Sequence, residues 1–172
     1  IELKVENGVV IPEVEKDVAM VSVIERFGIN GNKSLGFCSG WKLKKGAMAS
    51  SAAPDDNNLV VMGVSAEDMS IAANYLIKNG GGQVVVEDGK ILEFLPLPVG
   101  GIVTDEEPEV VAEAEEKLML ASRKLGCDLP DPVMYMIFLP ITAIPDYAIT
   151  DCGPIDCINL CVYNPILELN EK

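Results

Sequence analysis

The sequence predicts an α+β fold, in which a curved, mostly antiparallel and barrel-like sheet is flanked by helices at about residues 65–79 and 107–125. Two residue pairs, Asn7-Gly8 and Asp88-Gly89, lie between strand-like runs, and both suit the positive φ angles of a two-residue hairpin turn. The helical patterns interrupt the strands without the regular alternation of strand and helix that a parallel sheet requires. The chain is long enough for one well-packed domain, which we assign to residues 1–172.

The predicted strands follow in order from the N-terminus. Residues 3–11 form a hairpin that Pro12 ends, and residues 1–16 are interpreted as a β-hairpin that links the domain to a neighbour. Gly36 and Gly40 punctuate one strand-like run, where glycine indicates the close approach of another backbone, and we regard both as structural or interface candidates. Further strands are predicted at 18–25, 35–41, 47–52 and 59–64, and a second hairpin at 83–94.

Two segments have the spacing of amphipathic helices. Ser65 is a good N-cap for the first, acidic residues occupy its first turn, and Gly80 follows its last turn. The second begins near Pro108, which a first turn tolerates, and ends before Gly126. Their apolar stripes are Met69, Ala72, Ala73 and Leu76 in the first helix, and Val111, Ala114, Leu118, Ala121 and Leu125 in the second.

The C-terminal part is rich in proline and apolar residues. Its run at 133–139 fits a helix or a strand, and strand-like segments follow at 147–150 and 158–163. The mean hydropathy of +0.26 is high for a chain in which 23% of the residues are charged. This surplus and the proline-rich run 129–145 predict an apolar face that meets another domain or subunit, and self-association to at least a dimer when that neighbour is missing.

Charge and composition exclude several classes of partner. The chain has 13 basic and 27 acidic residues, and a net charge of −14 repels phosphate backbones, so we expect no nucleic-acid binding. The longest apolar run, 133–139, is far shorter than the roughly 20 residues of a membrane-spanning helix, so we expect no membrane contact. No signal peptide follows Ile1, and five cysteines in a chain of this size indicate reduced thiols; we expect a cytoplasmic piece of a longer protein.

No complete catalytic set is visible. The absence of histidine excludes a Ser-His-Asp triad, a Cys-His pair and an imidazole metal ligand. Ser50 and Ser51 have Lys44 and Lys45 nearby in the sequence, but such neighbours on a strand are rarely a nucleophile and its base. We therefore expect no catalytic residue in this chain.

Three cysteines cluster near the C-terminus, at Cys152, Cys157 and Cys161. A metal site needs thiolates and usually a fourth ligand, and the spacing is not Cys-x-x-Cys. We favour the interpretation that these are small buried side chains on one face of a strand, and we expect no metal ligand and no cofactor in this chain.

Two polar pairs leave alternatives open. Asp55 and Asp56 suit acid–base chemistry or an amine ligand, and equally suit the solvated turn that Pro-Asp-Asp-Asn-Asn favours. Glu25 and Arg26 end a strand, where they form either an ion pair across the sheet or an exposed edge.

Taken together, these landmarks resemble the C-terminal domain of adenine deaminase over almost the whole chain. The most informative segment runs from Gly46 to Asn58 and includes the small residues Ala49-Ser50-Ser51. The other landmarks occur in the expected order: Glu25-Arg26, Gly31-Asn32, Leu35-Gly36-Phe37, Gly40, Lys44, Glu67-Asp68-Met69, Asn74, Gly80-Gly81-Gly82, Val84-Val85-Val86, Asp88-Gly89, Leu95-Pro96-Leu97-Pro98, Leu125-Gly126-Cys127, Leu129-Pro130, Pro132, Phe138-Leu139, Ile144-Pro145 and Thr150-Asp151.

The resemblance implies a function for the longer protein. Family enzymes hydrolyse adenine to hypoxanthine and ammonia at a manganese or iron site in a preceding amidohydrolase barrel, which this chain lacks. The C-terminal domain packs on that barrel or on a second subunit, and we expect a homo-oligomer in which this domain is non-catalytic in isolation. The resemblance places Ser50, Ser51, Asp55 and Asn58 on the substrate side, and leaves Glu25 and Arg26 as structural or interface candidates.

The chain also departs from the family pattern. Phe27, Pro54 and Asn57 stand where the family carries histidines, and Asp56 also differs. These differences motivate the alternative that the chain is a stand-alone module that binds a small molecule or a partner protein.

Overall fold

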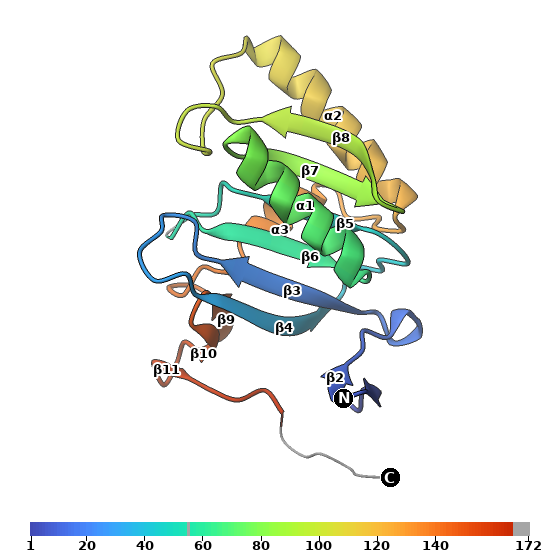
Figure 1. Cartoon of the computed structure of the whole chain (residues 1–172), viewed down its shortest axis with the longest axis vertical. Helices are drawn as coiled ribbons and strands as arrows, with labels where there is room; N and C mark the ends of the chain where they lie inside the picture. The colour runs from blue at the N-terminus through green and yellow to red at the C-terminus, as the bar shows by residue number, and fades with distance from the viewer. Residues whose placement is uncertain (55, 167–172) are drawn as a thin grey trace.

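The computed structural model describes residues 1–54 and 56–166 and is built around one open, antiparallel sheet of six strands (Figure 1). The strands lie in the order β4-β3-β6-β5-β7-β8, and every neighbouring pair is antiparallel. Their bounds are β3 (Val18–Ile24), β4 (Lys33–Ser39), β5 (Ala47–Ser50), β6 (Leu59–Gly63), β7 (Gly82–Glu87) and β8 (Lys90–Pro96). The predicted α+β class is confirmed, and the sheet does not close into a barrel because β4 and β8 remain its edges.

Helices cover both faces of this sheet, with α1 (Ala66–Asn79) on one face and α2 (Pro108–Lys124) and α3 (Pro132–Ile137) on the other (Figure 1). Alternate residues of the central strands face opposite layers: Ala47 and Ala49 pack with the α1 layer, whereas Met48 packs with the α2 and α3 layer. Because both faces are buried, the central strands are nearly continuous apolar runs, as the sequence shows.

The helix ends agree with the sequence signals. The Ser65 side chain accepts the backbone N–H of Asp68, and Gly80 closes α1 with a φ of 78°. Pro108 occupies the first turn of α2. The ambiguous run at 133–139 is mostly helix, because Pro132 and the cap at Asp131, which accepts the N–H of Met134, start the short helix α3.

Two small sheets flank the main sheet. The first is the predicted hairpin of β1 (Val5–Glu6) and β2 (Val9–Val10), turned by Asn7 and Gly8 at φ angles of 52° and 79°. The second has three strands, β9 (Tyr147–Thr150), β10 (Gly153–Asp156) and β11 (Cys161–Val162).

Some predicted bounds and roles are wrong. The strand expected at 35–41 runs from 33 to 39, and the strand expected at 158–163 is reduced to two residues, because β10 pairs first with β9 and a turn follows. At Gly36 a Cβ atom would lie 2.8 Å from the Ile149 side chain, so another element does approach closely there. Gly40 has open space around it and is needed for its φ of 97° instead.

Within the described ranges, no helix is both long and apolar enough to cross a membrane.

Candidate functional site

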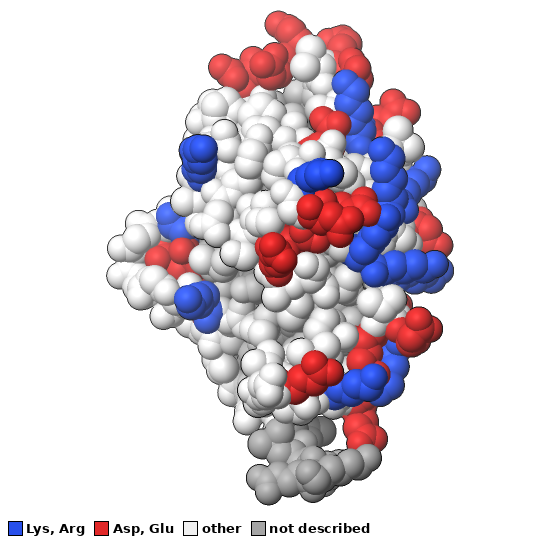
Figure 2. All heavy atoms as spheres, turned by 45° about the vertical axis from the view of Figure 1, so that its right-hand side comes forward, with Lys and Arg blue, Asp and Glu red and all other residues white. Residues whose placement is uncertain are grey.

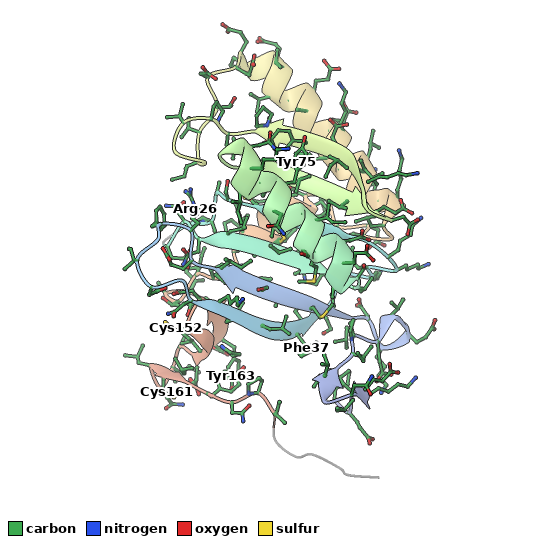
Figure 3. The ribbon with its side chains drawn as sticks, viewed as in Figure 1. Arg26, Phe37, Tyr75, Cys152, Cys161 and Tyr163 are labelled. Carbon is green, nitrogen blue, oxygen red and sulfur yellow. The ribbon has the colours of Figure 1, made fainter. Side chains whose placement is uncertain are left out.

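Most of the candidate residues lie at one end of the main sheet. The sheet is antiparallel, so β3 and β5 end at the same side where β6 and β7 begin. Ile24 is opposite Leu59, and Ser50 is opposite Gln83. The residues just outside these pairs therefore meet, and Figure 3 shows Arg26 at this end, beside the loops that leave the sheet.

The two serines are buried and occupied by structural hydrogen bonds. The Ser51 hydroxyl accepts the N–H of Gly82 at 2.8 Å and donates to the carbonyl of Gly101 at 2.6 Å. The Ser50 hydroxyl donates to the carbonyl of Ala52 at 3.0 Å. Ser51 thus joins the end of β5 to the start of β7 and to the loop after β8.

The serine–lysine pairing is not supported by the geometry. Lys45 precedes β5 and forms an ion pair with Glu87, at the far end of β7. Ser50 is five positions along the chain from Lys45, which corresponds to about 17 Å at the usual rise per residue of a strand. Lys45 therefore lies at the opposite end of the sheet from Ser50.

Glu25 forms neither of the two arrangements left open by the sequence. Its carboxylate accepts backbone N–H groups of Phe27 at 2.6 Å, Ile29 at 3.1 Å, Asn30 at 3.4 Å and Gly31 at 3.1 Å. Desolvation by itself raises the pKa of Glu25, but these four donors, Gly31 foremost, outweigh it and hold the pKa below its ordinary value. Glu25 therefore organises the loop that follows β3.

Arg26 connects three loops. Its Nε donates to the carbonyl of Asn57 at 2.5 Å, and its Nη2 donates to the carbonyl of Gly100 at 2.9 Å. The guanidinium carbon also lies 4.6 Å from the centre of the Phe27 ring, which is cation–π geometry. Arg26 thereby links the end of β3 to the loop before β6 and to the loop after β8.

Asp56 and Asn58 form a local pair within the loop before β6. The backbone N–H of Asn58 donates to one Asp56 oxygen at 3.0 Å, and its side-chain Nδ2 donates to the other at 3.1 Å. Burial, with a smaller contribution from nearby Asp151, raises the pKa of Asp56. Asn58 is buried, and its Oδ1 has no hydrogen-bond partner among the described residues. Asp55 lies outside the described residues.

A cavity of about 410 Å³, here called the edge cavity, opens at this end of the sheet. Its aliphatic walls come from β3, β6 and α1, through Ile24, Leu59, Leu76 and Ile77. Glu25, Arg26 and Ser51 supply its polar side chains, and glycines from the loop after β3 and the end of α1 complete the lining.

The described residues do not form a metal centre. No group of three or more His, Cys, Asp or Glu side chains within them is placed to hold an ion. All five cysteines are free, and Cys152 and Cys161 are exposed on the three-stranded sheet (Figure 3). The interpretation that the C-terminal cysteines are buried on one strand face is wrong, because the segment turns after β10 instead of continuing as a strand.

Sequence reasoning missed the loop at residues 99–103 as part of this site. Gly100 and Gly101 reach Arg26 and Ser51 there, and a Cβ atom at Gly101 would lie 2.8 Å from Arg26 Nη1. The double glycine was the available signal, since it permits the positive φ angles of 65° and 74° seen in the loop.

Comparison with known proteins gives a consistent result. A family model described as the adenine deaminase C-terminal domain matches residues 1–160. Adenine deaminase 1 of Desulfotalea psychrophila is 70% identical over 99% of this chain and 29% of its own length. Adenine deaminase 1 of Latilactobacillus sakei is 60% identical over 97% of this chain and 28% of its own length, and adenine deaminase 4 of Rhizobium meliloti is 51% identical over 96% and 28%. The chain spans less than a third of each of these relatives.

Proposed function

The chain belongs to the adenine deaminase C-terminal domain family, and we propose that it serves as that domain in an enzyme that hydrolyses adenine to hypoxanthine and ammonia. The family match over residues 1–160 carries the proposal. The three relatives described above are all named adenine deaminase and are each more than three times as long as the matched part. The alternative of a stand-alone binding module gains no support from them.

We propose that the reaction itself takes place in the preceding part of the protein. The chain contains no histidine, and the described residues hold no group that fits a manganese or iron ion. We therefore assign the metal to the amidohydrolase barrel, and we assign no step of the reaction to residues of this domain.

The role proposed for this domain is to present the loop before β6 to the barrel. Asn58 carries a buried amide oxygen that no described residue satisfies, and such an oxygen is costly unless a donor reaches it. Arg26 and Ser51 hold the surrounding loops in place from within the domain. Because this oxygen is inaccessible from outside the folded chain, a donor from the barrel domain would reach it only after the loop before β6 rearranges on docking.

Exposed apolar side chains support association with that domain or with a second subunit. Several lie around the edge cavity, including Phe27, Ile29 and Ile77, at 53%, 81% and 62% exposure. In Figure 2, charged side chains gather at the upper end, along the right-hand edge and in a cluster near the centre of the face, and the left-hand part carries only scattered charges. We propose a homo-oligomer in a reducing, cytoplasmic setting, where the five free thiols persist.

A domain exchange tests the proposed function. The C-terminal domain of the Latilactobacillus sakei relative is replaced by this chain, and ammonia release from adenine is measured with added manganese or iron. We expect the chimera to be active and the isolated chain to be inactive. Turnover by the isolated chain well above background, or a folded chimera without activity, would contradict the proposal.

Two variants of the chimera test the presented loop. Asn58→Ala removes the buried amide, and we expect kcat/KM to fall about tenfold or more through misplacement of the loop. Glu113→Ala, which breaks an exposed ion pair with Lys117 on α2, serves as the matched control and is expected to leave kcat/KM unchanged. Equal activities of the two variants would refute a role for the loop.

Light scattering on the isolated chain tests association. We expect at least a dimer, because the apolar surface that normally meets a neighbour is uncovered. A monomer of 18.4 kDa at all concentrations would show that this surface is not an interface by itself.

A further inference from the structure

We propose that the outer side of α2 binds the same helix of a second copy of this chain, in antiparallel orientation about a two-fold axis beside residues 119–120. This inference rests on the homo-oligomer proposed above and names its surface. It concerns a different part of the molecule from the edge cavity, because α2 covers the face of the main sheet opposite to α1 (Figure 1).

The charges of α2 are divided between its two parts. Residues 105–116 include seven acidic and no basic residues, whereas residues 117–124 include three basic and no acidic residues. The helix dipole favours acidic side chains only near the first turn, so it does not account for Glu115 and Glu116 in the middle of the helix. The charge pattern therefore suits a partner that is itself divided into an acidic and a basic part.

This pattern is self-complementary about residues 119–120. Glu115 and Glu116 precede that point by about one turn, and Arg123 and Lys124 follow it by about one turn. An antiparallel second copy places its Lys124 opposite Glu115 and its Arg123 opposite Glu116, and the two-fold axis makes each contact twice. All four side chains are exposed, and none forms an ion pair with another described residue.

Apolar side chains lie at the centre of this surface and beside it. Leu120 is 47% exposed, and the neighbouring Met119 is partly buried. A groove of about 260 Å³ lies between α2 and α3, and its floor is apolar. The carboxylates that line it are those of Glu115, Glu116 and Asp131. Because long basic side chains lay their aliphatic stems along apolar surface and keep the charge near polar groups, the groove suits those from the last turn of a second α2.

The overall charge restricts where two copies can meet. With a net charge of −14, they repel each other unless the surfaces in contact carry opposite charges. Figure 2 shows acidic side chains at the upper end, where α2 begins in Figure 1, and basic side chains along the right-hand edge below them. Lys44 adds to the basic part, since its backbone N–H donates to the carbonyl of Leu125 at 2.8 Å.

Charge reversal in the 172-residue chain tests the contact, with sedimentation equilibrium as the measurement. One variant, Glu115→Lys with Glu116→Lys, makes the acidic side of the contact basic. The other, Arg123→Glu with Lys124→Glu, makes the basic side acidic. The salt concentration is held at about 0.1 M, where charges more than about 10 Å apart are largely screened.

A control separates the contact from the net charge. Glu6→Lys with Glu67→Lys changes the net charge by the same amount as the first variant, at exposed positions outside α2. We expect the parent chain and this control to form dimers of similar affinity.

We expect each charge-reversed variant alone to dimerise at least about tenfold more weakly than the parent chain, because like charges then face each other twice. An equimolar mixture of the two variants should regain the affinity of the parent, since opposite charges face each other again. This recovery also shows that both variants are folded.

A parent chain that stays monomeric at all concentrations would overturn the proposal. So would a mixture that associates no more tightly than its components, or dimers that both variants leave intact, which would assign the contact to the rim of the edge cavity. The result does not depend on deamination: an inactive chimera contradicts the proposed function and leaves the α2 contact standing.

Discussion

Gly80 and Gly81 are neighbouring glycines that differ in backbone angle and in surroundings, so replacing each by alanine compares an open position with a crowded one. Both have positive φ angles, 78° and 117°. A Cβ atom on Gly80 has no heavy atom within 4 Å. A Cβ atom on Gly81 would lie 2.6 Å from Ser51 Oγ and would overlap the Cα atom of Gly101.

The expected losses follow from these two environments. At Gly80, alanine has only the cost of the left-handed conformation, about 1 kcal/mol. At Gly81, a φ of 117° lies in a region that is almost restricted to glycine and costs about 1–3 kcal/mol. The overlap with Gly101 adds about 1–3 kcal/mol of overpacking, since backbone atoms yield less easily than a flexible side chain. We expect Gly81→Ala to lower the free energy of unfolding by about 2–6 kcal/mol.

Urea unfolding measures both losses, with the fluorescence of Trp41 as the signal. Trp41 is the only tryptophan and lies in the core beneath α2 and α3, so its environment changes when the domain unfolds. The m-values of the two variants and of the parent chain are compared to ensure that the same surface is exposed. Equal losses at the two positions, or a larger loss at Gly80, would refute the close approach of Gly81, Ser51 and Gly101.

Three further substitutions and modifications test other parts of the structure. Asp68→Ala removes the buried carboxylate that accepts two N–H groups of the β7–β8 turn. We expect it to lower the free energy of unfolding by about 1–3 kcal/mol, as measured by urea unfolding. Glu67→Ala, at an exposed neighbouring position, is the control and should have little effect. Burial raises the pKa of Asp56 above its ordinary value of 3.8, so the native state favours the protonated carboxyl. As the pH rises from 3.8 through the folded-state pKa, the parent chain should therefore lose stability relative to Asp56→Asn, which urea unfolding at several pH values measures. A stability difference that stays constant over that range would contradict this. Desolvation, with a smaller effect of nearby Asp17, raises the pKa of the partly buried Cys38 thiol to about 12. Thiol labelling of the native chain, read by mass spectrometry, should therefore modify exposed Cys152 faster than Cys38, and equal labelling rates would contradict this.

Local signals predicted most of the elements correctly. Asn7-Gly8 turns the first hairpin, and Ser65 caps α1, because each depends on interactions within a few residues. The C-terminal segment was harder to predict, since the pairing of β10 with β9 and the exposure of Cys161 depend on where a turn falls in an apolar run.

The candidate site was predicted only in part. The resemblance placed Ser50, Ser51, Asp55 and Asn58 on the substrate side, and that role stays a prediction. The antiparallel register brings the segments of Ser50, Ser51 and Asn58 to one end of the sheet. The function of each side chain there did not follow from the sequence. Glu25 accepts hydrogen bonds from backbone groups of a loop, and Arg26 donates to such groups. The two residues therefore form neither the ion pair across the sheet nor the exposed edge that the sequence left open.

The sequence by itself determined the class of fold, the helix caps, the hairpin turns and the family, since each is encoded in short-range patterns or in an ordered set of motifs. Only the tertiary structure decided that the sheet stays open and that an edge cavity forms at one of its ends. The contact between Arg26 and Gly100 joins residues 74 positions apart. Such contacts depend on the order of the strands in the sheet, and the conformational preferences of short sequence segments do not specify that order.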